Sequence, residues 1–162
     1  MTVAVEQFKN VTGDSTVQWL AVGMAEAVST EMNRFAPYRM IERLQIEKLM
    51  KQRELKQAAG EATSMEDAQM GKMLGAKGIV TGSYQAVAGN LRIDGRLIEV
   101  ETGNIMTTAS ATGTMAELAR IQRIIALTLS GRSDALELAE LGGDARPHAQ
   151  ARGRHGDDGT VG

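Results

Sequence analysis

Acidic side chains are the residues most able to do chemistry in this chain, because it has no cysteine and both of its histidines lie near the C-terminus. Glu99 and Glu101 are two residues apart in a predicted strand and therefore point to one face, whereas Asp94 points to the other. A carboxylate pair works as acid and base only when its surroundings separate the two pKa values. Nothing around these residues predicts the burial that would do so, and we assign no catalytic residue.

The two histidines, His148 and His155, lie in a segment of glycine, arginine and aspartate without an apolar period. Metal capture is one interpretation, and a solvated tail is the one that the composition favours. With no other histidine and no cysteine, the sequence offers neither a Ser-His-Asp nor a thiol nucleophile, nor a typical zinc site. We therefore expect no metal site and no cofactor.

A loop between a predicted strand and a predicted helix is the next candidate, because anions often bind at such places. It lacks the glycine spacing of a dinucleotide-binding loop and the Lys-Ser/Thr pair of a P-loop, and Asp14 would repel a phosphate. The pattern favours a capping turn, and an anion site remains the alternative. The residues of that site would be Asn10, Thr12, Gly13 and Ser15.

Alternating charges mark a later strand, where Arg92, Asp94 and Arg96 share one face. This pattern predicts a salt-bridged, solvated ladder or an oligomer contact. Lysine and arginine in the second predicted helix alternate with glutamate and have no aromatic neighbours, which is typical of an exposed face rather than an RNA surface. The formal net charge of −2 likewise gives no reason to expect a nucleic-acid partner.

These residues are positioned by an α/β fold with the predicted order βαβααβββα. Strands are expected over 2–8, 38–43, 78–86, 91–100 and 105–112, and helices over 15–35, around 46–53, over 64–74 and over 114–129. The turns at 89–90 and 102–104 are too short for a parallel crossover, so the last three strands form an antiparallel meander. The fold class is an open mixed sheet with helices packed on it.

Composition limits how this fold is built. Hydrophobic residues make up 43% of the 162 residues and aromatic residues only 3%, so the core consists of aliphatic side chains and methionine. We expect one domain over 1–141 and a flexible tail over 142–162, where the apolar period is lost. No segment is predicted to cross a bilayer as a helix, and no leader is recognised at the start of the chain.

Five segments together resemble a known family. They are 3–14 (VAVEQFKNVTGD), 20–28 (LAVGMAEAV), 40–49 (MIERLQIEKL), 74–83 (LGAKGIVTGS) and 91–103 (LRIDGRLIEVETG). In this order they resemble the curli-assembly CsgG family and its relatives with a TolB-amino-terminal-like domain.

The resemblance implies an exported, non-enzymatic protein of a Gram-negative cell envelope, periplasmic and associated with the outer membrane. Ring-forming members of the family imply a homo-oligomer. Members of the family carry an acylated N-terminal cysteine, which implies peripheral or lipid-anchored association with a membrane. This chain has no cysteine, so we expect that association only for a full-length protein.

Pore-forming members carry two long insertions that become membrane-spanning hairpins. At these positions this chain has only 88–90 and 113–114. Each membrane-spanning strand needs about 9–11 residues, so we expect no such hairpin here.

The predicted function is therefore that of an envelope assembly or accessory domain acting through protein–protein contacts. An edge strand is a natural place for such contacts, and the last strand supplies Ile105, Thr107, Ala109 and Ala111. The alternative is a regulatory module that senses a small ligand or anion at the loop that contains Asn10.

Overall fold

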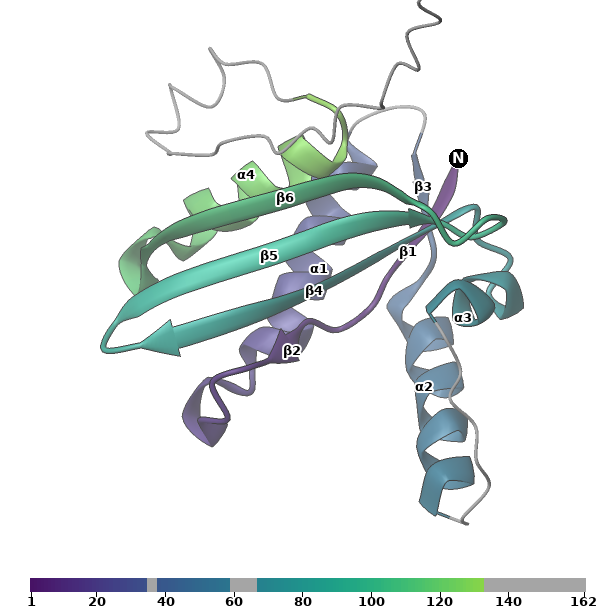
Figure 1. Cartoon of the computed structure of the whole chain (residues 1–162), viewed down its shortest axis with the longest axis horizontal. Helices are drawn as coiled ribbons and strands as arrows, with labels where there is room; N and C mark the ends of the chain where they lie inside the picture. Colours follow the sequence, from purple (N-terminus) through teal and green to yellow (C-terminus); the bar gives the residue numbers. More distant parts are fainter. Residues whose placement is uncertain (35–37, 59–66, 133–162) are drawn as a thin grey trace, which may run out of the picture.

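A computed structural model describes residues 1–34, 38–58 and 67–132, which form one mixed sheet with helices on both faces (Figure 1). The strands are β1 (Thr2–Val5), β2 (Lys9–Asn10), β3 (Arg39–Met40), β4 (Gly78–Val87), β5 (Asn90–Glu99) and β6 (Ile105–Thr114). The helices are α1 (Leu20–Asn33), α2 (Arg43–Ala58), α3 (Asp67–Met73) and α4 (Leu118–Leu129), with short 3-10 turns η1 (Ser15–Val17) and η2 (Met115–Glu117). Apart from the additional strand β2, this is the predicted order, and the α/β fold class is confirmed.

The strand order is β3-β1-β4-β5-β6, with β2 paired to β4 beyond the end of β1. β1 is parallel to β3 and β4, whereas β4, β5 and β6 form the predicted antiparallel meander. Ala88 and Gly89 connect β4 to β5 with φ angles of 51° and 79°, as a two-residue hairpin turn with both central residues at positive φ requires. The meander thus leaves β6 at one edge of the sheet and β3 at the other.

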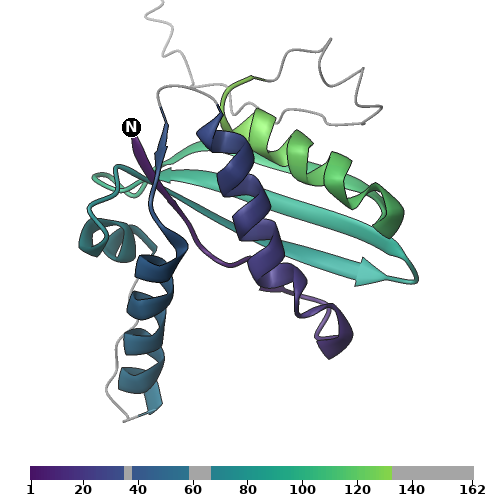
Figure 2. The same cartoon turned by 180° about the vertical axis from the view of Figure 1, so that it is seen from behind.

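The two faces of the sheet are covered unequally. Helices α1 and α4 lie side by side across one face, as the view from behind shows (Figure 2), and form the larger core with β4, β5 and β6. Helices α2 and α3 pack on the opposite face only near β1, where a second core forms. Members of this second core are Ala4, Ile46, Leu49, Met70, Ala76, Ile79, Ile98 and Val100. Most of the opposite face of β4–β6 therefore has no helix over it among the described residues.

The predicted strand over 2–8 is wrong in its second half, because a bulge breaks it. Val5 pairs with Val80 and Lys9 with Ser83, so three residues of the first segment stand opposite two of β4. The extra residue reverses the alternation of side chains. Phe8 consequently enters the larger core together with Val5, instead of pointing to the opposite face.

A glycine at position 82 makes room for the Phe8 ring. Gly82 and Gly95 are paired across β4 and β5, and a Cβ built on Gly82 would overlap the ring and lie 2.5 Å from the carbonyl oxygen of Asp94. A Cβ on Gly95 would meet nothing closer than 3.5 Å. The ring can therefore lie against the sheet only because position 82 has no side chain.

Several element boundaries differ from their predictions. Asp14 caps η1, and α1 begins only at Leu20. The second predicted strand shrinks to β3, because the chain already turns into α2 at Arg43.

The sequence predicts that Gly75 ends the third helix and that Thr114 and Glu117 form a capping box, and both helix signals are confirmed. Gly75, with φ 71°, follows α3, and Thr114 and Glu117 form a capping box at η2. The sequence also predicts that Pro37 ends the first helix and that Ser64 caps the third. Both positions lie outside the described residues, as do the tail over 142–162 and both histidines.

We predict that Gly82→Ala lowers the free energy of unfolding by about 3 kcal/mol, because neither the backbone of Asp94 nor a buried ring can move aside cheaply. The matched variant Gly95→Ala should change it by less than about 1 kcal/mol, since its new methyl group finds ordinary van der Waals contacts. Urea denaturation of the two variants measures both values. Equal effects would contradict the packing of Phe8 described here.

Candidate functional site

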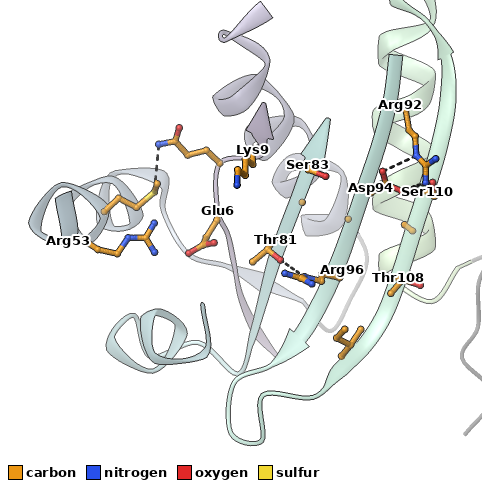
Figure 3. Close-up of a pocket in the computed structure, with 16 residues that line it drawn as sticks. Glu6, Lys9, Arg53, Thr81, Ser83, Arg92, Asp94, Arg96, Thr108 and Ser110 are labelled. Carbon is orange, nitrogen blue, oxygen red and sulfur yellow. Dashed lines mark hydrogen bonds and ion pairs between the residues drawn. The ribbon is translucent and has the colours of Figure 1, made fainter. Parts of the chain in front are cut away.

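A groove with a volume of about 710 Å³ occupies the uncovered face of the sheet (Figure 3). Its floor is formed by β4, β5 and β6, its wall by α2, and its inner corner by the segment between β1 and β2. The polar and charged side chains that line it are Glu6, Gln7, Lys9, Arg53, Thr81, Ser83, Arg92, Asp94, Arg96, Thr108 and Ser110. Most of the described side chains that line the groove are therefore polar or charged, and Met50, Ile105 and Ala109 add apolar surface to it.

Helix α2 forms a wall beside the sheet because only its first half packs against the second core. Ile46 and Leu49 are buried in the second core, whereas residues 51, 52, 54 and 55 are exposed and the helix extends away from the sheet (Figure 1). Arg53 follows Ile46 by seven residues and Leu49 by four, so it lies on the same side of the helix and reaches the groove. That spacing was the available sequence signal for this residue, and it was missed.

The predicted charge ladder on β5 forms part of the floor, and its salt bridge is confirmed for Arg92 and Asp94 but not for Arg96. Arg92 donates hydrogen bonds to both carboxylate oxygens of Asp94, with the Nε to Oδ2 distance at 3.0 Å, and Ser110 donates to Oδ1 at 2.8 Å. The bonds to Asp94 raise the pKa of Arg92 above its ordinary value. Arg96 donates from Nε to the Thr81 hydroxyl at 3.0 Å. The ladder is thus pinned to its neighbouring strands on both sides.

The corner of the groove comes from the bulge. Glu6 is 7% exposed, and its backbone N–H still donates to the carbonyl of Val80. Lys9, just past the bulge, is exposed and also lines the groove. Neither residue was identified as a site residue from the sequence, because the bulge that places them was not recognised.

The structure does not join the acidic residues into a reaction centre. Glu99 accepts a hydrogen bond from the Thr102 hydroxyl, and Glu101 lies in the turn after β5 rather than in the strand, so the predicted common face is wrong. Within 1–34, 38–58 and 67–132, no three His, Cys, Asp or Glu side chains gather where they could hold a metal ion.

The loop predicted as an anion site is a compact turn whose polar groups bond to one another. The Asn10 amide donates to the carbonyl of Asp14, and its oxygen accepts from the N–H of Thr12. The carboxylate of Asp14 accepts from the hydroxyl and the N–H of Thr16, and these bonds hold the pKa of Asp14 below its ordinary value. A negative charge of the chain itself therefore occupies this turn, while Gly13 and Ser15 are exposed beside it.

The predicted interaction edge is an edge strand, but half of its named side chains point inward. Ala109 and Ala111 are buried under α4, Thr107 is half-buried, and Ile105 is exposed. A partner at this edge would therefore meet mainly the backbone of β6.

Helices of the described ranges are all too short or too polar to cross a lipid bilayer. The connections after β4 and β6 are short as well, since Ala88 and Gly89 alone link β4 to β5 and η2 follows β6 directly.

Comparison with known proteins relates this fold to envelope components. The family model of the curli production assembly/transport component CsgG matches residues 1–92. Among curated protein sequences, none matches the chain.

Solved structures with this fold include the lipoprotein GNA1162 from Neisseria meningitidis, at 16% identity over 70% of this chain and 79% of that chain, with a TM-score of 0.57. The C-terminal domain of LpoB from Salmonella enterica is 16% identical over 70% and 82%, with a TM-score of 0.56. TolB from Acinetobacter baumannii is 12% identical over 83% of this chain and 28% of that chain, with a TM-score of 0.54. At such identities the likeness establishes a shared fold.

We predict that the contribution of Asp14 to stability depends on pH. A folded-state pKa below the ordinary value of 3.8 means that the contribution is complete above that value and disappears as the pH falls through the lower, folded-state pKa. At neutral pH, Asp14→Ala should therefore melt at a lower temperature than the wild type, and the difference should shrink in strong acid.

The matched variant Asp14→Asn keeps a capping oxygen but does not titrate, so it should melt closer to the wild type at neutral pH than Asp14→Ala does. Thermal melts of the three proteins across acidic pH make the comparison. A difference between wild type and Asp14→Ala that is independent of pH would contradict the role of the charge.

Proposed function

Since the family model covers residues 1–92, this chain belongs to the family of the curli production assembly/transport component CsgG, and we propose that it is a non-enzymatic assembly or accessory domain of the cell envelope. It acts through contacts with other proteins. Membership of the family supports the envelope role.

Strand β6 is the observation that carries the proposed mode of action. It is ten residues long and contains no charged residue and no proline, and within the described part of the chain it pairs on one side only, with β5. Alternate residues of such an edge strand direct their N–H and C=O groups outward, where another strand can accept and donate hydrogen bonds.

Strand β3, at the opposite edge of the sheet, is protected against pairing with a further strand. β3 has only two residues and offers very little backbone to a further strand. Proteins that avoid edge-to-edge pairing place lysine, proline or a short strand at the edge. β6 uses none of these devices, which supports strand addition by a partner or by a second copy of the chain.

The same proposal includes an outer-membrane-associated, periplasmic location and a homo-oligomer. Both are supported by the family. GNA1162, which shares the fold, is a lipoprotein, and a lipid anchor in a longer form of this chain would bring the domain to a membrane surface.

A small-ligand or anion sensor remains the alternative function. The turn around Asn10 gives it less support than the edge strand gives to a docking role, because Asp14 supplies the negative charge there. If the turn does bind anions, inorganic phosphate should raise the melting temperature of the wild type, and Asp14→Asn should enlarge that rise. No rise in either protein would remove this alternative.

We predict that a photo-crosslinking amino acid at Thr112, on the exposed part of β6, captures a protein of the envelope or a second copy of the chain. The matched position is Thr30, which is exposed on α1. The longest natural form of the protein, expressed in the organism that encodes it, is irradiated in living cells, and the fractionated envelope is analysed for adducts. Adducts from Thr112 alone are the expected result.

Thr112→Lys places a charge on the edge strand and should abolish the association that light scattering or crosslinking detects, whereas Thr30→Lys should preserve it. Both variants should melt near the wild-type temperature because both positions are exposed. A cytoplasmic location, or a monomer without adducts from either position, would overturn the proposed function.

A further inference from the structure

The groove on the uncovered face carries a local charge opposite to that of the whole chain. Among the described residues, four basic and two acidic side chains line it, although the chain has a formal net charge of −2. Asp94 neutralises Arg92 directly. In the described part of the chain, Lys9, Arg53 and Arg96 form no ion pair. Arg53 donates from Nη1 to the sulfur of Met70 at 3.9 Å, a weak bond that does not neutralise its charge. Three basic groups in one concave surface are therefore not neutralised by an ion pair in the described residues.

The two guanidinium groups among them approach the groove from different elements. Arg53 extends from the α2 wall and Arg96 lies on the β5 floor, with Glu6 between them in Figure 3. The hydrogen bond from Nε of Arg96 to Thr81 orients its guanidinium group and leaves both Nη atoms for another acceptor. A guanidinium group binds a carboxylate or a phosphate through two parallel hydrogen bonds, so this pair is suited to a ligand with two or more anionic groups.

The rest of the lining selects among anionic ligands. None of the described residues that line the groove is aromatic, so they offer no platform on which bases or sugar rings could stack. Its floor presents hydroxyl groups on β4 and β6, and Met50 and Ile105 provide apolar contact at its two sides. Hydroxyl groups, short apolar contacts and guanidinium groups together match a peptide that carries carboxylates.

We propose that this groove binds an acidic peptide segment of a partner protein, whose carboxylates pair with Arg53 and Arg96. The proposal rests on the proposed role in protein–protein contact and adds the chemistry of the partner. Continuity with the edge strand supports it, because Ile105, Thr108 and Ser110 belong to β6 and also line the groove. A segment that crosses the groove would thus arrive directly at the edge where strand addition takes place.

Glu6 gives the proposal a sharper consequence. Its side chain is nearly buried at the inner corner, between Arg53 and Arg96 in Figure 3, and its carboxylate would oppose a second negative charge there. The variant Glu6→Gln should therefore bind an acidic ligand more tightly than the wild type does. The loss of a residue with only a structural role would not increase this affinity.

The test measures binding of a fluorescent decapeptide of alternating glutamate and serine to the 162-residue chain by fluorescence anisotropy. The probe should bind, and its affinity should fall as salt is added. Arg53→Gln and Arg96→Gln should each weaken binding about tenfold, since each removes a charge-assisted bidentate contact. Glu6→Gln should strengthen it severalfold. Lys48→Glu, on the exposed side of the same helix, should change it little.

Competing probes make every outcome decisive. The matched glutamine–serine decapeptide, inorganic phosphate, a galacturonate oligomer and an oligothymidylate are tested beside the acidic peptide. Tighter binding of any of these, equal effects of Lys48→Glu and Arg53→Gln, or no binding of the acidic peptide would overturn the proposal. Thr112 does not itself line the groove, so adducts from Thr112 without peptide binding would reject the groove and keep the proposed function.

Discussion

The packing of the Phe8 ring against Gly82 is the constraint on which the rest of this structure depends. It fixes the register in which the first segment of the chain meets β4, because the ring can lie against the sheet only where no Cβ stands in its way. The bulge before Phe8 follows from the same contact, since without one extra residue the ring would point to the other face. The larger core and the corner of the groove therefore both depend on the bulge between β1 and β2. The residue that turns Phe8 inward also sets the position of Lys9 at the corner of the groove.

The unequal covering of the sheet explains why one face is a core and the other a binding surface. On β5, Ile93 and Leu97 alternate with Arg92, Asp94 and Arg96, and only the apolar set meets α1 and α4. Hydrogen bonds to Ser110 and Thr81 satisfy the charged set without a covering helix. A face built in this way is stable in water and still offers ion-pairing groups, which a buried face could not do without a large desolvation cost.

Local patterns in the sequence predicted the parts of the fold that depend on neighbours along the chain. The meander followed from two short turns, and the capping box at Thr114 and Glu117 followed from its spacing. The break in the first strand was missed, although a signal was present. Val3 and Val5 are followed by Phe8 rather than by an apolar residue at position 7, and this shift in the alternation is the mark of a bulge.

The groove depends on the angle at which α2 leaves the sheet, and no local pattern in the sequence encodes that angle. Its floor ladder was therefore predicted, while Glu6, Lys9 and Arg53 were not.

The two proposed contacts reinforce one another physically. Backbone pairing along β6 is nearly independent of sequence, so by itself it would accept many extended segments and distinguish them poorly. Ion pairs in the adjoining groove depend on the side chains of the partner and would discriminate by charge, with like charges excluded as strongly as opposite charges are attracted. Because both surfaces share β6, a partner that occupies one is held close to the other and need not find it by a separate encounter. The uncharged edge strand would thus contribute affinity through backbone hydrogen bonds, and the arginines of the groove would contribute specificity for the partner.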